Sequence, residues 1–149
     1  MHRIALGIVL AALVAGCRKD APATVPPIGI ATEEIVEDTK KVEVKIGYRP
    51  APEREVELVV DLRAIGIEEM DKLVVDITVD GFVLVKGEPE WSGFVAPRIP
   101  INHRASFRLL EGTESGTLKV SVQRSVDSTL LLEREFSFAA EGDRVAPTS

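Results

Sequence analysis

A strict alternation of apolar and polar residues, which begins at Lys41, most constrains how this chain can fold. In the first run, Val42, Val44, Ile46 and Tyr48 alternate with glutamate, lysine and glycine. Similar runs follow at residues 56–62, 73–79, 105–109, 118–122 and about 129–138. A period of two is typical of half-buried β-strands, because successive side chains point to opposite faces. No stretch is long enough for a substantial amphipathic helix, so the pattern predicts an all-β chain.

Turn-forming residues separate these runs. They are Arg49-Pro50-Ala51-Pro52, Gly66, Gly87, Glu111-Gly112, Ser115-Gly116 and Asp127-Ser128. About seven short strands with such spacing predict an antiparallel β-sandwich of immunoglobulin-like or fibronectin-III-like topology. The chain has one cysteine, so the disulfide of antibody domains cannot form and no family within that group is recognised.

Two positions carry more specific expectations about the strands. Asp80-Gly81 is the strongest hairpin signal, because a type I′ turn requires positive φ at both central residues. We expect it to join the run 73–79 to a return strand, Phe82–Lys86. In the last run the alternation places Arg134 on the inner face, which predicts a bulge or an edge position there.

The first seventeen residues have the organisation of an export signal. Met1-His2-Arg3 is basic, Ile4–Val14 is apolar, and Ala15-Gly16 precedes the single cysteine, Cys17. Residues 4–16 are too few to span a bilayer, which requires about 20 apolar residues. The segment Leu13-Val14-Ala15-Gly16-Cys17 resembles the lipobox of bacterial lipoproteins.

This resemblance implies a lipid anchor. The Cys17 thiol would receive a diacylglyceryl group, and the lipoprotein signal peptidase would cut between Gly16 and Cys17. Two or three acyl chains on one residue would hold the protein on the membrane without spanning it. Arg18 follows Cys17, and it departs from the Asp that retains lipoproteins in the inner membrane. In a host with two membranes, the resemblance therefore favours the outer membrane, with the protein facing the periplasm. An ordinary cleaved signal with a cysteine near its junction is the alternative.

The sequence divides into four predicted regions. These are a lipoprotein signal peptide at 1–16, a lipidated N-terminus and flexible linker at 17–40, a β-sandwich domain at 41–139, and a disordered tail at 140–149. The linker is inferred from its prolines and acidic residues, which follow neither period. Ile28, Ile30, Ile35 and Val36 could instead form a first strand.

Composition argues against several functions. Lys and Arg total 18 and Asp and Glu total 24, and a net charge of −6 gives no electrostatic basis for binding nucleic acid. One cysteine and two histidines are too few for a His/Cys metal site within one chain. We interpret His103 as a solvent-exposed residue at the start of a strand, because no other residues complete a catalytic triad. We therefore expect no enzyme activity, no metal and no cofactor.

Residues 87–100 form the most unusual segment of the chain. It contains Trp91, Phe94, Arg98 and three prolines. Aromatic residues and arginine dominate contact hot spots, so these three residues are candidates for contact with a partner or ligand. Trp91 and Phe94 could instead cover one open end of the sandwich.

These observations predict a lipid-anchored accessory or binding protein of the cell envelope. Cys17 would tether it to the membrane, and the sandwich would contact a partner protein. A small-ligand or glycan-binding envelope lipoprotein is the alternative. An exposed Trp91 beside a concave pocket would favour the ligand binder, whereas an exposed apolar patch or an unpaired edge strand would favour the protein partner.

Overall fold

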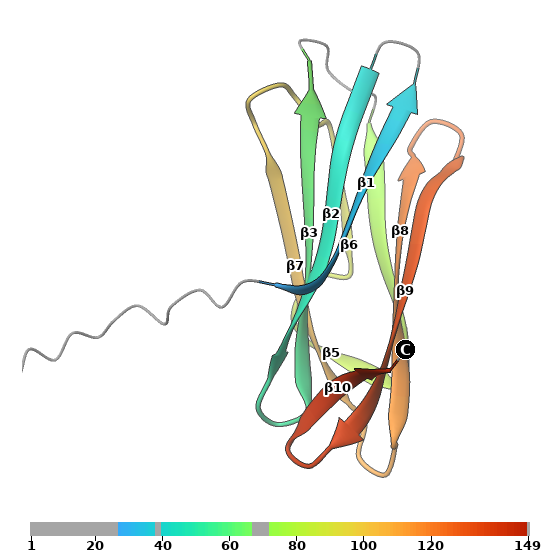
Figure 1. The fold of residues 1–149 in the computed structure, drawn as a ribbon. Helices are drawn as coiled ribbons and strands as arrows, with labels where there is room; N and C mark the ends of the chain where they lie inside the picture. Colours follow the sequence, from blue (N-terminus) through green and yellow to red (C-terminus); the bar gives the residue numbers. More distant parts are fainter. Residues whose placement is uncertain (1–26, 38–39, 67–71, 149) are drawn as a thin grey trace, which may run out of the picture.

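The chain forms two five-stranded antiparallel sheets that face one another (Figure 1). The computed structural model describes residues 27–37, 40–66 and 72–148. Their strands are β1 (Ile28–Glu37), β2 (Lys40–Ala51), β3 (Glu55–Ile65), β4 (Leu73–Asp80), β5 (Phe82–Gly87), β6 (Glu90–Gly93), β7 (Ile101–Leu109), β8 (Ser115–Arg124), β9 (Leu130–Glu141) and β10 (Arg144–Thr148). The first sheet has the order β1-β2-β3-β7-β5 and the second β10-β9-β8-β4-β6. The predicted all-β sandwich is confirmed.

The strand order has the arrangement of a constant-type immunoglobulin domain. Such domains place strands A, B, E and D in one sheet and C, F and G in the other. In chain order, β2, β3, β4, β5, β7, β8 and β9 occupy these seven positions. β1, β6 and β10 are additional outer strands beside β2, β4 and β9, so the described residues form ten strands where about seven were expected.

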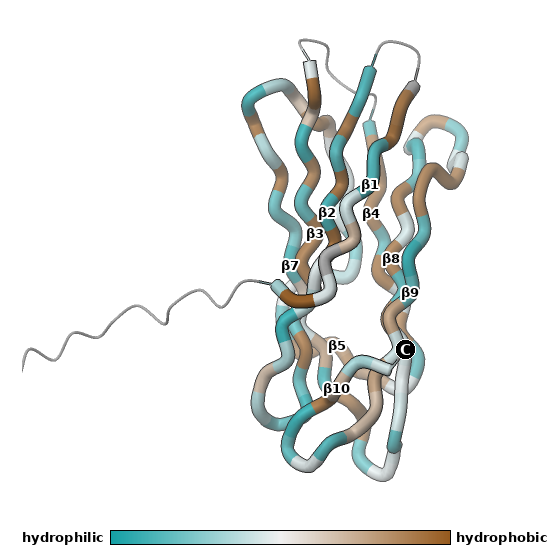
Figure 2. Tube along the Cα trace, viewed as in Figure 1, coloured by the Kyte–Doolittle hydropathy of each residue, from teal (hydrophilic) through white to brown (hydrophobic). Residues whose placement is uncertain are grey.

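The core lies between the sheets and follows the predicted alternation. On β2, Val42, Val44, Ile46 and Tyr48 are each at most 5% exposed. The Tyr48 ring meets Phe138 of the opposite sheet edge-to-face, with ring centroids 5.0 Å apart. Figure 2 shows hydrophobic and hydrophilic residues alternating along the strands. Burial of one face of each sheet therefore holds the two layers together.

The sandwich includes more of the chain at both ends than the sequence predicted. Part of the predicted linker 17–40 forms β1, which pairs with β2 along its length. This confirms the alternative of a first strand, in which Ile35 is 5% exposed. Within the predicted tail, β10 pairs with β9 and buries Val145 to 3% exposure. Neither segment has the regular alternation of the inner strands, and each pairs with a neighbouring strand of the sandwich. Residues 1–26, with the predicted signal peptide and Cys17, lie outside the described residues.

The Asp80-Gly81 turn carries the chain from the second sheet, which contains β4, to the first sheet, which contains β5. The predicted hairpin between these two strands is therefore wrong. β4 pairs with β6 and β8 in the second sheet, whereas β5 pairs with β7 in the first. Gly81 has φ 76° and accepts a hydrogen bond of 2.9 Å from the Leu110 N–H. A Cβ at Gly81 would lie 2.9 Å from the Ser115 carbonyl oxygen, so this close approach requires glycine.

Arg134 lies on an edge, as the alternation predicted. β10 covers residues 137–141 of β9 and leaves Arg134 beyond the paired stretch. The ladder of β8 and β9 is irregular between Val122 and Gln123, close to the expected bulge. The Arg134 guanidinium forms an ion pair with Glu33 of β1, and this pair links the two sheets. An inward arginine is tolerated here because its charged group is partly open to solvent.

Candidate functional site

Trp91 lies on β6, and its side chain contributes to the packing of the sandwich. It lies opposite Val75 in the β4–β6 ladder, and its half-buried side chain packs against the core. The indole also lies over Gly93, where an added Cβ would approach Trp91 Cζ2 to 2.9 Å. The interpretation of Trp91 as a cover for the sandwich fits this packing better than a role as an exposed contact residue.

The other two candidate contact residues, Phe94 and Arg98, are exposed but do not line the same pocket. Phe94 follows β6 and is 57% exposed. Arg98 lies in the loop before β7 and lines a pocket to which neither Trp91 nor Phe94 contributes. The structure therefore does not bring the three predicted residues together into one site.

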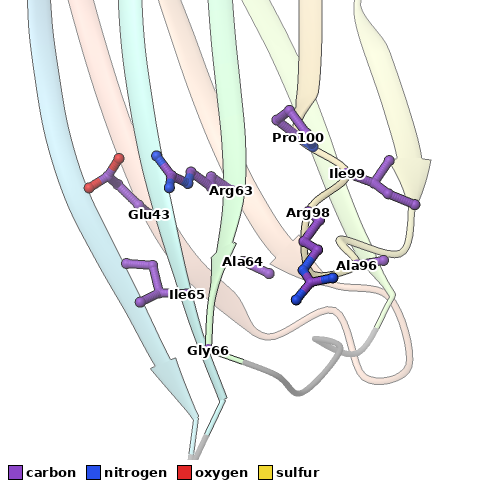
Figure 3. A pocket seen from close by; sticks show the side chains of 9 residues that line it. All are labelled: Glu43, Arg63, Ala64, Ile65, Gly66, Ala96, Arg98, Ile99 and Pro100. Carbon is purple, nitrogen blue, oxygen red and sulfur yellow. The ribbon is translucent and has the colours of Figure 1, made fainter.

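The pocket beside Arg98 lies between the end of β3 and the loop before β7 (Figure 3). Its volume is about 690 Å³, within the range of small-molecule sites. Figure 3 shows side chains from two sides: those of β2 and β3, and those of residues 96–100. The lining residues are Glu43, Arg63, Ala64, Ile65, Gly66, Ala96, Arg98, Ile99 and Pro100.

A tight turn presents Arg98 to this pocket. The Ile99 N–H donates a hydrogen bond of 3.2 Å to the Ala96 carbonyl, with Pro97 and Arg98 between them. Arg98 has φ 65°. Proline followed by a residue of positive φ is the pattern of a type II turn, in which glycine or asparagine usually takes the second position.

His103 differs from the sequence interpretation, because it is half-buried and not solvent-exposed. It lies on β7 opposite Val60, and its Nε2 atom is buried without a hydrogen-bond partner. Burial lowers the pKa of the imidazole, while a hydrogen bond to the Glu88 backbone and the Glu88 charge act in the opposite direction.

The outer strand β5 combines an unpaired edge with apolar residues. It ends the first sheet, and among the described strands only β7 pairs with it. Val83, Leu84 and Val85 are consecutive and 46%, 40% and 42% exposed, and Val79 at the end of β4 is 38% exposed. Each outer strand has a feature that discourages pairing: β1 has several glutamates, β10 contains proline, β6 has four residues, and the ladder of β5 with β7 is irregular between Leu84 and Lys86. On β5 the residues before this irregularity, Phe82 to Leu84, are uncharged.

The backbone of β5 directs hydrogen-bonding groups outward. The hydrogen bond from Leu110 to Gly81 makes Phe82 and Leu109 a pair without mutual hydrogen bonds. In an antiparallel ladder such pairs alternate with hydrogen-bonded pairs. Phe82 and Leu84 therefore point their N–H and C=O groups away from β7, where a further strand could bind them.

Neither a group of potential metal ligands nor a helix that could span a membrane occurs in the described part of the chain. In residues 27–37, 40–66 and 72–148, no three His, Cys, Asp or Glu side chains are grouped so as to hold a metal ion. No helix in these ranges is long and apolar enough to cross a membrane. The chain matches no protein-family model and no curated protein.

The sequence interpretation missed Arg63 and the free edge of β5. Arg63 is an ordinary outward residue in its strand, and only the fold places it beside the loop before β7. The run Val83-Leu84-Val85 did contain a signal, since three consecutive apolar residues depart from the alternation of a half-buried strand. Its interpretation as the return strand of a hairpin concealed that signal.

Proposed function

We propose that this protein is a lipid-anchored accessory protein of the bacterial cell envelope that binds a partner protein by strand addition to β5. The observation that supports this proposal is the outward-facing backbone of Phe82 and Leu84 beside exposed apolar side chains. An extended segment that adds to such an edge gains main-chain hydrogen bonds, and its alternate side chains provide specificity.

The surroundings of β5 indicate the chemistry of the partner segment. Val83, Leu84 and Val85 of β5 are exposed apolar residues, and Lys86 is exposed and makes no ion pair among the described residues. A strand with alternating apolar residues and one carboxylate opposite Lys86 would complement this edge.

Lipidation of Cys17, which the resemblance to lipoproteins implies, would support a weak contact of this kind. Anchoring restricts the protein to the membrane and raises its effective concentration toward other envelope proteins. A short strand with few hydrogen bonds could then hold a partner. The ligand-binding alternative at Trp91 has less support, because that side chain is half-buried against the core.

Site-specific crosslinking in cells tests the β5 contact. A photoreactive residue at Val83 is expected to yield one discrete protein adduct, whereas the same residue at Val126, which is 83% exposed, is expected to yield none. Equal adducts at both positions, or none at Val83, would exclude β5 as the binding edge.

A pair of matched substitutions distinguishes strand addition at β5 from nonspecific hydrophobic association. Leu84→Lys places a charge on the free edge and is expected to reduce recovery of the adduct partner at least about tenfold. Leu130→Lys makes the same chemical change at a residue that is 52% exposed on β9, and it is expected to leave recovery unchanged. Circular dichroism of both variants shows whether the sandwich is intact.

A further inference from the structure

The four most exposed large hydrophobic residues of the described chain all lie at one end of the sandwich. They are Val126, Ile99, Val36 and Phe94, which are 83%, 62%, 61% and 57% exposed. Val36 lies near the end of β1, Phe94 and Ile99 lie between β6 and β7, and Val126 lies between β8 and β9. Figure 1 shows these segments at the upper end of the molecule, where β3 ends. We call Phe94, Ile99 and Val126 the apolar tip.

Strand pairing places two residues of the apolar tip at the same end of one sheet. Leu73, the first residue of β4, lies between Gly93 of β6 and Arg124 of β8. Phe94 directly follows Gly93, and Val126 follows Arg124 by two residues. Two strands that flank a third are about 10 Å apart. Phe94 and Val126 therefore extend from neighbouring positions at this end.

Ile99 extends the apolar tip to the first sheet. It lies two residues before β7, and Figure 3 shows its side chain on the side of the loop away from β3. Arg98 beside it is exposed and makes no ion pair among the described residues. An aliphatic side chain next to an arginine suits a bilayer surface, because the apolar group can enter the acyl boundary while the guanidinium binds lipid phosphate.

The opposite end of the sandwich has no equivalent group of apolar side chains. Its connections are residues 52–54, 81, 110–114 and 142–143, and in them Leu110 is the only exposed large hydrophobic residue. Glu111 and Glu114 follow Leu110 and are also exposed. Residues 38–39 and 67–71, which lie outside the described residues near the apolar tip in sequence, contain acidic residues too. We therefore distinguish the two ends by their apolar side chains and not by charge.

The predicted lipid anchor can reach the level of the apolar tip. β1 runs from Ile28 toward this end over 10 residues, or about 33 Å. The segment from Cys17 to Ile28 spans at most about 40 Å, so it can return along β1. It can also reach the opposite end, because Ile28 pairs with Tyr48 near the end of β2. The exposed side chains therefore decide which end faces the bilayer.

We propose that the apolar tip inserts into the headgroup region of the bilayer that holds Cys17, with Arg98 bound to lipid phosphate. This inference rests on the proposed lipid anchor and is independent of the β5 contact. β5 begins at Phe82, which pairs with Leu109 at the end of β7, whereas the apolar tip adjoins the start of β7. Insertion of the apolar tip would thus leave the β5 edge open to a partner protein.

Fluorescence quenching by labelled lipids tests the position of the apolar tip. The lipidated full chain, with its diacylglyceryl group verified by intact mass, is reconstituted into phosphatidylcholine vesicles. Val126→Cys or Leu110→Cys then carries an environment-sensitive fluorophore, because lipidation of the single natural cysteine leaves the new thiol as the only free one. Phosphatidylcholine with a spin label high on its acyl chain is expected to quench the fluorophore at position 126 and not the one at 110.

Two further substitutions separate insertion of the apolar tip from the effect of the fluorophore itself. With the fluorophore at position 126, Phe94→Ser is expected to lower the ratio of inserted to free protein about tenfold, because an aromatic side chain no longer enters the lipid. Leu110→Ser removes an apolar side chain that is 45% exposed at the opposite end, and it should leave the quenching unchanged. Circular dichroism shows whether each variant is folded.

The possible results distinguish this inference from the proposed function. In a lipidated protein, equal quenching at positions 126 and 110, no quenching at 126, or quenching that Phe94→Ser does not change would overturn insertion of the apolar tip. The proposed anchor and the β5 contact would still stand. A protein without lipid on Cys17 would overturn the proposed anchor and this inference with it.

Discussion

Individual residues in this sandwich adopt backbone conformations that the sequence does not favour. Glu53 and Arg54 form the turn between β2 and β3 with φ 63° and 59°. Asparagine and glycine are the residues that usually occupy consecutive turn positions of positive φ, as in turns of type I′. Asp143 supports the turn, since its carbonyl accepts a 2.7 Å hydrogen bond from the Arg54 N–H and its carboxylate a 3.2 Å bond from the Glu53 N–H. Contacts from a distant loop thus replace the usual local preference.

Glu53→Asn is expected to stabilise the protein. Asparagine adopts positive φ more readily than glutamate, and the gain should be about 0.5–1 kcal/mol, or a few degrees in melting temperature. The lost contact between Glu53 and Arg108, at 3.3 Å on the surface, should cost little. Thermal unfolding followed by circular dichroism measures the change. Glu114→Asn, at an exposed position that does not have positive φ, is the control, and an equal shift in both variants would contradict this explanation.

His103 is expected to make stability depend on pH between about 7.5 and 5.5. Burial lowers its pKa in the folded protein, so the unfolded chain takes up a proton first as the pH falls through the ordinary value of about 6.5. Stability is therefore full above that pH and decreases below it, until the folded state is also protonated. Urea unfolding at a series of pH values is expected to show this decrease.

Two variants assign this pH dependence to one residue. His103→Leu, which also removes the unpartnered Nε2 atom, should flatten the profile between pH 7.5 and 5.5. In the uncleaved chain, His2→Gln changes the only other histidine and should leave the profile as in the wild type. A slope that persists in His103→Leu would assign the effect to other groups.

At the scale of strands, the sequence predicted which segments are extended better than it predicted which strands pair. Alternation identified the inner faces of β2, β3, β4 and β8 correctly, because burial on one side of a sheet determines the period directly. The Asp80-Gly81 signal describes only the local turn. Whether the next strand joins the same sheet or the opposite one depends on β7, about twenty residues later, so a local signal cannot decide it.

The outer strands were harder to predict for a related reason. β1 and β10 each add to an existing edge, and much of what holds them is backbone hydrogen bonding, which is independent of residue type. The residues of the candidate site were also difficult to predict where their positions depend on distant parts of the chain. Arg98 was identified from its own segment, whereas Arg63 and β5 gain their significance from neighbours that are far away in sequence.

For the whole molecule, the start of β1 shortens the proposed membrane tether. Ile28 follows Cys17 by eleven residues, and a chain of that length spans at most about 40 Å. The twelve residues of β2 extend over a similar distance, about 40 Å at 3.3 Å per residue. A sandwich anchored at Cys17 would therefore stay within about its own length of the membrane, which restricts the proposed partner of β5 to proteins in or near that membrane.

Intact mass spectrometry of the protein recovered from membranes tests this tether. The wild type is expected to lack residues 1–16 and to carry a diacylglyceryl group on Cys17, as the resemblance to lipoproteins implies. Cys17→Ala removes the only thiol, so it is expected to retain residues 1–16 and to carry no lipid. Thr24→Ala changes a residue between Cys17 and β1 and should have the wild-type processing, because it lies outside the lipobox. A wild-type protein cut at another bond, with a free Cys17 thiol, would instead identify an ordinary export signal. The confinement of the β5 edge to the membrane would then have no physical basis.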